Sequence, residues 1–231
     1  TGMGGTLGYV ATVVGIGAVF GAILEHSGAT ERLSVFLLEK FGMEKAPIAL
    51  SIAGFLIAIP VFFDVAFVIL VPMLYALQKK TNKSLLFVAS PLLASLAVTH
   101  AFIPPTPGPI AVADIINVSL GWVIMMGFVV GIPTTLVAGI FFGKYIASKI
   151  HIGVPEAMRQ QFAEQKEYKH LSIGLIFCLI LTPILLILGN TLTDMLIRSK
   201  QIEASFTTDL CTFLGHPFVA LIISTLLALY F

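Results

Sequence analysis

Charged side chains are scarce in this sequence. Aspartate, glutamate, lysine and arginine together make up 11% of the 231 residues, whereas apolar residues make up 58%. An ordinary soluble domain carries about 25% charged residues, and the mean hydropathy of this chain is +1.02. The composition therefore argues against a soluble domain and predicts an integral membrane protein.

The sequence also has few cysteines and almost no excess of either charge. The net charge is +1 and the basic residues stand in short connectors, so no nucleic-acid partner is expected. The two cysteines, Cys178 and Cys211, have neither metal-ligand spacing nor a disulfide pattern. No metal site and no cofactor are predicted.

Long apolar runs alternate with polar connectors. The runs show no period-2 alternation, and a helix satisfies its own backbone hydrogen bonds in hydrocarbon, so the predicted fold class is an all-α polytopic membrane protein. The expected segments are a transmembrane helix at 7–24, an amphipathic connector at 25–45, a re-entrant hairpin at 46–77, a broken transmembrane helix at 85–118, a transmembrane helix at 121–148, a cytoplasmic connector at 149–170, a transmembrane helix at 171–189 and a truncated transmembrane helix at 218–231.

The hairpin is inferred from the length of the run at 46–77. One straight helix of this length would measure about 48 Å, against a hydrocarbon core of about 30 Å, and two full spans would need about 40 residues. Two shorter helices that meet near Pro60 fit the length, because proline interrupts the helical hydrogen bonds. The predicted tip covers residues 59–64 and includes Asp64. A single tilted span with a proline kink is the alternative.

The broken helix is inferred from "THAFIPPTPGPIAVAD" at 99–114, which places four prolines inside a strongly apolar region. Prolines cannot donate backbone hydrogen bonds, and they push the preceding residues towards extended conformations. Such a loop is tolerated at membrane depth where it packs in protein or faces a water-filled cavity. An extramembrane loop between two short helices is the alternative.

Basic residues predict the orientation of these segments. The "QKKTNK" segment at 78–83 and the connector at 149–170 are both rich in lysine or arginine, which predicts a cytoplasmic position for both. The connector at 25–45 is assigned to the same side. Its apolar residues Leu33, Phe36, Leu37 and Phe41 predict an amphipathic helix on the membrane surface or on a neighbouring helix.

Few ionisable residues remain within the apolar runs, and each is a functional hypothesis because charge in a membrane is costly. Asp64 lies at the hairpin tip, His100 at the start of the proline segment and Asp114 after it. Interrupted helices expose N–H groups at their N-termini, which suit a carboxylate substrate. A structural role for His100, with its imidazole bonded to a freed carbonyl, stays open beside the functional one.

Three motifs carry a resemblance to a known family: "GGTLG" at 4–8, "FFDVAFVILVP" at 62–72 and "VTHAFIPPTPGP" at 98–109. The sequence resembles the gluconate:proton symporters of the GntP family, in the ion transporter superfamily. The resemblance implies that the chain is one half of an inverted-repeat transporter, similar to the first repeat, and that it is a piece of a longer protein. It also implies a multi-pass protein of the bacterial inner membrane. Relatives in the superfamily are commonly homodimers, so the same assembly is an expectation here.

The resemblance implies that this protein is part of a secondary active transporter that imports gluconate, or a related sugar acid or hydroxy acid, together with protons. It implies no enzyme activity. D-serine or a dicarboxylate is the alternative substrate. Sodium-coupled dicarboxylate relatives carry Ser-Asn-Thr at comparable tips, and its absence here favours protons. The residues expected to bind substrate are Pro60, Phe63, Asp64, Thr99, His100, Pro104, Pro105, Thr106, Pro107 and Gly108.

The proton-coupling residues expected are Asp64, His100 and Asp114. Asp64 is the first choice because phenylalanines flank it and burial disfavours a charged carboxylate. His100 is the second, since histidine exchanges protons near neutral pH.

Two other classes fit the sequence less well. An intramembrane aspartyl protease would need a Gly-x-Gly-Asp context, which neither Asp64 nor Asp114 has. A passive channel is not favoured either, because interrupted helices at mid-depth are typical of alternating-access carriers.

Overall fold

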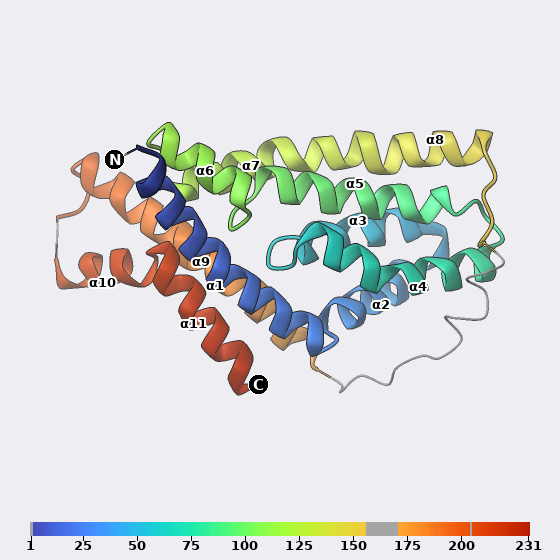
Figure 1. The fold of residues 1–231 in the computed structure, drawn as a ribbon, viewed down its shortest axis with the longest axis horizontal. Coiled ribbons are helices and arrows are strands. Elements are labelled where there is room, and N and C mark those ends of the chain that lie inside the picture. The colour runs from blue at the N-terminus through green and yellow to red at the C-terminus, as the bar shows by residue number, and fades with distance from the viewer. Residues whose placement is uncertain (1, 156–170, 204) are drawn as a thin grey trace.

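The computed structural model describes residues 2–155, 171–203 and 205–231, and every regular element in these ranges is a helix (Figure 1). Four helical segments are long and apolar enough to cross a membrane: Leu7–His26, Leu86–Ile115, Leu120–Lys149 and Ile173–Arg198. The last two helices of the chain, bent by 68° relative to each other, form a fifth if they are counted as one span. The predicted class, an all-α polytopic membrane protein, is confirmed.

The order of the elements along the chain includes one 3-10 turn, η1, and one π-helical segment, η2. They are α1 (Gly2–His26), α2 (Ala29–Phe41), η1 (Met43–Lys45), α3 (Ala46–Ile57), α4 (Phe63–Thr81), α5 (Leu86–Phe102), α6 (Pro107–Ile115), α7 (Leu120–Thr135), η2 (Leu136–Phe141), α8 (Phe142–Lys149), α9 (Ile173–Arg198), α10 (Phe206–Leu214) and α11 (Pro217–Tyr230).

The α3 and α4 helices are the two arms of a hairpin whose loop, residues 58–62, lies near the middle of the long axis of the molecule (Figure 1). Pro60 lies in this loop, where its missing N–H interrupts no helix. Helix α5 packs against both arms. Its approach to α3 is close, since a Cβ added at Gly54 would lie 3.0 Å from the Leu92 carbonyl oxygen.

The α5 and α6 helices form one interrupted span from Leu86 to Ile115. The interruption covers residues 103–106 and contains a cis peptide bond between Pro104 and Pro105. The chain then returns through α7, η2 and α8, which pack along α5. A Cβ at Gly139 would lie 3.2 Å from the Pro91 Cα atom, so the two spans are in direct backbone contact.

The ends of the hairpin, the start of α5 and the end of α8 lie at one end of the molecule. Lys83 forms a 3.3 Å ion pair with Glu44, which joins the two ends of the hairpin. The Ser84 hydroxyl donates a 2.8 Å hydrogen bond to the Ile150 carbonyl, and the Leu85 N–H donates one of 2.8 Å to the Ile152 carbonyl. The basic segment at 78–83 and the start of the 149–170 connector therefore share one end. Residues 156–170 of that connector lie outside the described residues, and the cytoplasmic position stays a prediction.

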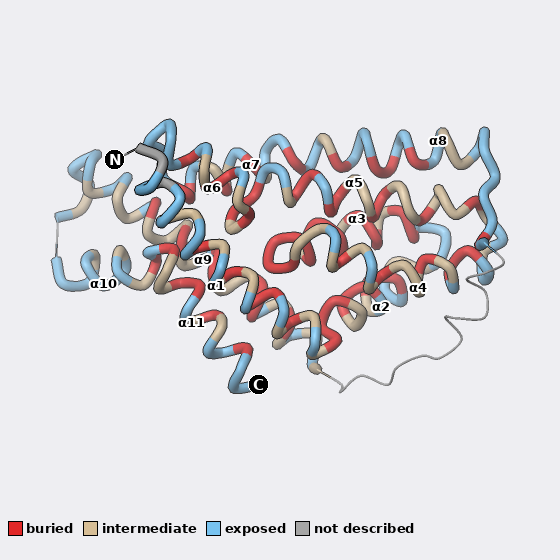
Figure 2. The backbone as a smooth tube through the Cα atoms, in the orientation of Figure 1, coloured by how far each residue is buried: buried red, intermediate tan, exposed pale blue. Residues whose placement is uncertain are grey.

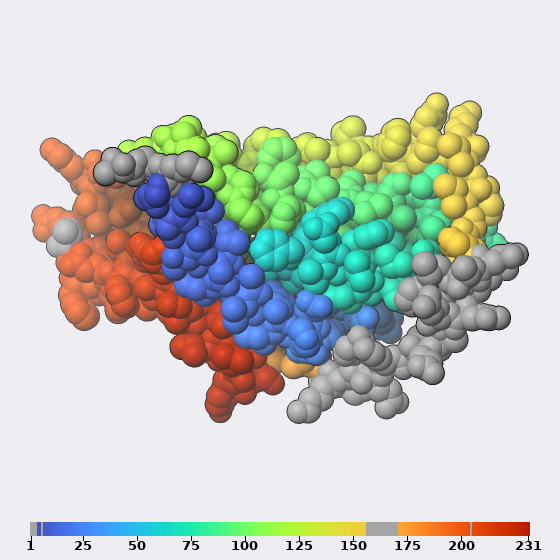
Figure 3. All heavy atoms as spheres, in the orientation of Figure 1, coloured from blue at the N-terminus to red at the C-terminus, as the bar shows by residue number. Residues whose placement is uncertain are grey.

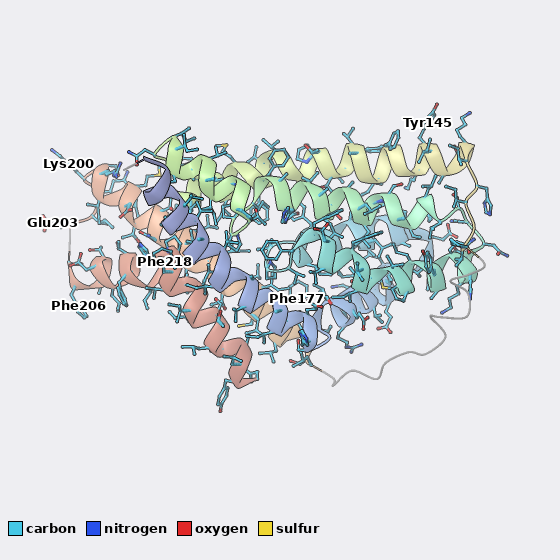
Figure 4. All side chains as sticks on the ribbon, in the orientation of Figure 1. Tyr145, Phe177, Lys200, Glu203, Phe206 and Phe218 are labelled. Carbon is cyan, nitrogen blue, oxygen red and sulfur yellow. The ribbon has the colours of Figure 1, made fainter. Side chains whose placement is uncertain are left out.

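Buried residues, coloured red along the backbone in Figure 2, form two clusters. The first joins α2, α3, α4 and α5 to the C-terminal half of α1 and the start of α9. The second joins the N-terminal half of α1 to α6, α7, α9 and α11, and includes the Tyr9–Phe218 pair, with ring centroids 5.4 Å apart (Figure 4 labels Phe218). Helix α1 belongs to both clusters and so connects the two parts of the fold.

Many large apolar side chains are exposed along α7, η2 and α8, among them Val129, Val137, Phe141 and Tyr145, the last of which is labelled in Figure 4. Exposed apolar side chains suit a helix that contacts hydrocarbon or another apolar surface. These side chains therefore agree with a membrane setting.

Candidate functional site

The hairpin loop and the α5–α6 interruption meet against α1. The three elements enclose a space of about 10 Å³, lined by Val14, Gly17, Ile59, Pro60, Val61, Phe62, Pro105 and Thr106. This volume is about enough for one water molecule, so the three elements lie close together there. Figure 3 shows the hairpin, in cyan, reaching α1, in blue, and the green α5–α6 region at the molecular surface. The fold therefore brings together the two interruptions predicted from the prolines, and we call this meeting point the tip junction.

Helix α4 starts at the tip junction with unbonded backbone N–H groups. Its N-cap residue is Phe62, whose side chain makes no capping hydrogen bond, and the first helical bond runs from the Ala66 N–H to the Phe62 carbonyl, 3.0 Å. The N–H groups of Phe63, Asp64 and Val65 therefore have no acceptor within the helix. Free N–H groups and the positive end of the helix dipole make this end suitable for an anion.

Helix α6 also starts at the tip junction. Its first turn contains Pro107, Gly108 and Pro109, so that only Gly108 offers an N–H group. Gly108 is exposed. The N-cap residue Thr106 is 4% exposed, and its hydroxyl donates a 2.9 Å hydrogen bond to the Ile103 carbonyl, which closes the turn inside the interruption.

His100 and Phe62 join the last turn of α5 to the hairpin loop. Their rings pack edge-on, with centroids 5.8 Å apart. The His100 Nδ1 atom is buried and has no hydrogen-bond partner among the described residues. The Asp64 carboxylate is near enough for a Coulombic interaction with the imidazole. The fold therefore brings together two predicted site residues, the acid Asp64 from α4 and the base His100 from α5.

Asp64 is exposed on the surface of the tip junction, in the first turn of α4. The flanking phenylalanines led us to expect a sheltered carboxylate. Phe63 instead stacks on Phe67, with ring centroids 6.4 Å apart, one turn further along the same helix. A helix separates adjacent side chains by about 100° around its axis, so apolar neighbours in sequence do not enclose Asp64.

Like Pro60 and Thr106, the predicted site residues Thr99 and Pro104 are buried. Thr99 is 0% exposed, and its hydroxyl has no hydrogen-bond partner within the part of the chain that the structure describes. Its carbonyl accepts the last α5 hydrogen bond, 2.9 Å from the Ile103 N–H. Thr99 and Pro104 therefore do not share the exposure of Asp64 and Gly108.

Asp114 lies away from the other predicted residues. It is exposed at the far end of α6, seven residues and about 10 Å beyond Pro107. There it lines a separate cavity of about 200 Å³ together with Tyr9, Asn117, Asn190, Thr191 and Asp194. Asp194, which the sequence reasoning passed over, is the second carboxylate of this cavity.

Sequence comparison decides the family. Residues 1–231, the whole chain, match the GntP family permeases. This chain belongs to the GntP permease family. The family and the apolar helices together show a multi-pass protein of the bacterial inner membrane. The resemblance drawn from the glycine-rich start and the proline segment is confirmed.

Several relatives of this GntP permease carry transporter names. It is 34% identical over 229 residues to a low-affinity gluconate transporter of Escherichia coli strain K12, covering 99% of this chain and 50% of the relative. It is 34% identical over 237 residues to a gluconate permease of Bacillus subtilis strain 168, covering 99% and 52%. A third relative, 32% identical over 229 residues, is the Gnt-II system L-idonate transporter of Escherichia coli strain K12, with 99% and 51% covered.

The GntP permease chain spans about half the length of these curated relatives. No solved structure matches it.

Proposed function

We propose that this GntP permease imports gluconate, or a related sugar acid or hydroxy acid, together with protons. The observation that carries the proposal is the tip junction. There, the residues that precede α4 and α6 line one small space together with α1. The gluconate transporters and permeases among the relatives support the choice of substrate.

The carboxylate of the substrate binds to backbone groups in this proposal. Phe63, Asp64 and Val65 offer N–H groups at the start of α4, and Gly108 offers one at the start of α6. The rings of Pro60, Pro104 and Pro105 and the hydroxyl of Thr106 hold the two loops outside helical geometry, and Pro107 starts α6. Thr99 and His100, in the last turn of α5, are the remaining residues proposed to bind the substrate.

Proton coupling follows from the position of Asp64 at the helix end that receives the substrate. An ionised Asp64 would repel a bound carboxylate and occupy the free N–H groups, whereas a protonated Asp64 is neutral and leaves the positive helix end available. Binding of the anion and of the proton therefore favour each other. His100, which interacts with Asp64, is the second proton carrier proposed, and Asp114 is a third at a different position.

The assembly proposed is a homodimer in the lipid bilayer. The test is chemical cross-linking of the full-length protein in native membranes, where a monomer alone would contradict it.

L-idonate is the second candidate substrate, because one relative carries that name. D-serine and dicarboxylates are weaker candidates. A competition assay separates them: excess unlabelled L-idonate, D-serine or succinate is added while uptake of labelled gluconate is measured, and the strongest competitor identifies the preferred substrate.

The experiment that tests transport uses full-length protein in proteoliposomes. We expect saturable accumulation of labelled gluconate when the outside is acidic, and its loss when an ionophore collapses the pH gradient. A channel would only equilibrate gluconate across the membrane. Accumulation that persists without a pH gradient, or no uptake at all, would overturn the proposal.

A further inference from the structure

Helix α1 touches the hairpin loop at a residue without a side chain. Gly21 is buried, and a Cβ added to it would collide with the Pro60 carbonyl oxygen and would also lie 3.1 Å from the Pro60 carbonyl carbon. The atoms in the way belong to the backbone, which cannot turn aside as a flexible side chain can. Only glycine allows α1 and the hairpin loop to come this close.

The same helix touches the α5–α6 interruption one turn earlier. Gly17 is buried, and its added Cβ would lie 3.3 Å from the Pro105 Cγ atom and 3.6 Å from its Cβ atom. Residues four apart share one face of a helix, so Gly17 and Gly21 form a single smooth strip. A Gly-x-x-x-Gly spacing usually lets two membrane helices approach closely. Here the two glycines instead contact two loops, the hairpin loop and the α5–α6 interruption.

Four other glycines that the structure describes in the same helix differ from these two. A Cβ added at Gly4, Gly5, Gly8 or Gly15 would meet nothing within 4 Å. The close approach is therefore restricted to the positions that face the hairpin loop and the interruption. It is not a general property of a glycine-rich helix.

We propose that Gly17 and Gly21 are positioning residues that set the separation of the hairpin loop and the α5–α6 interruption, and through it the separation of the α4 and α6 N-termini. The proposal rests on the proposed transport function. Gly21 lies behind Pro60, three residues before α4 starts, and Gly17 lies behind Pro105, two residues before α6 starts. A side chain at either position pushes one set of N–H groups away from the other.

The test compares Gly21→Ala, Gly17→Ala and the matched control Gly15→Ala in the full-length protein in proteoliposomes. The KM and maximal rate of gluconate counterflow are measured, with the amount of folded protein determined by size-exclusion chromatography. We expect Gly21→Ala to raise KM about tenfold or more, because the backbone of the loop must move. The rise for Gly17→Ala should be smaller, since a proline ring can yield slightly, and Gly15→Ala should match the wild type.

A general loss of stability would lower the amount of active protein, and with it the maximal rate, while KM stayed constant. A KM for Gly21→Ala equal to that of Gly15→Ala would therefore overturn the positioning role. If Gly21→Ala does not reach the membrane, Gly17→Ala decides the question by the same comparison of KM values. Failure of the wild-type protein to exchange gluconate would instead overturn the proposed function.

Discussion

Asp64→Asn separates proton coupling from substrate binding. Asparagine has nearly the shape of a protonated aspartate and carries no charge, so it imitates the state that we propose for substrate binding. Asp64 is exposed in the first turn of α4, where loss of its charge removes a favourable interaction with the helix dipole of about 0.3–1 kcal/mol. The fold should therefore persist in the variant.

The effect on binding can be worked out from this position. A carboxylate bound at the free N–H groups of α4 would lie about 5 Å from the Asp64 carboxylate. Two negative charges at that distance repel by about 1–3 kcal/mol for effective dielectric constants of about 80 to 20. This corresponds to an affinity difference of about fivefold to 150-fold between the ionised and the neutral state. The Asp64→Asn variant should therefore bind gluconate at high pH at least as well as the wild type.

The assay is uptake of labelled gluconate into proteoliposomes with an outside pH one unit below the inside pH. With one proton per gluconate, the wild type can reach an accumulation of about tenfold, since one pH unit is worth about 1.4 kcal/mol. The Asp64→Asn variant should exchange gluconate in counterflow but reach a ratio of about one. Asp194→Asn is the matched control, because it changes a carboxylate in the separate cavity, and it should accumulate gluconate normally.

An Asp64→Asn variant that still concentrates gluconate under the imposed pH gradient would refute the coupling role. His100 would then be the next residue to test. Loss of both accumulation and counterflow, with normal folding, would also contradict the reasoning, since it would make the charge of Asp64 necessary for binding.

Three further predictions concern the tip junction and its support. Pro104→Ala combined with Pro105→Ala should restore helical hydrogen bonding across the interruption and abolish gluconate binding while membrane insertion persists; unchanged uptake would place the segment outside the site. Thr106→Val removes a buried hydrogen bond and should cost about 1 kcal/mol in thermal unfolding, whereas Thr106→Ser should be close to wild type. Gly54→Ala, whose Cβ would meet the α5 backbone, should destabilise the protein by about 1–3 kcal/mol, and Gly174→Ala, which meets nothing within 4 Å, should not.

The sequence by itself determined the class of the protein and predicted that proline interrupts its helices near residue 60 and within 99–108. Composition and apolar run lengths are sufficient for the all-α membrane class. Backbone groups in hydrocarbon must bond to each other, and a chain without alternating polar residues achieves this as a helix. Proline acts on its own backbone, so the prolines predicted an interruption at 99–108, and the structure has a shorter one at 103–106, between α5 and α6. The family could be read in the same way, from motifs that are contiguous in the chain.

Tertiary structure alone decided which of these local features meet. Asp114 is close to the proline segment in sequence, yet the length of α6 carries it to another cavity. Asp64 has phenylalanine neighbours, yet the rotation of successive residues around the helix leaves it exposed. Gly17 and Gly21 were absent from the sequence-based site, because the function of a missing side chain depends on what approaches it. Here the hairpin loop and the α5–α6 interruption both approach α1 at these glycines. The packing of whole helices determines how closely they approach.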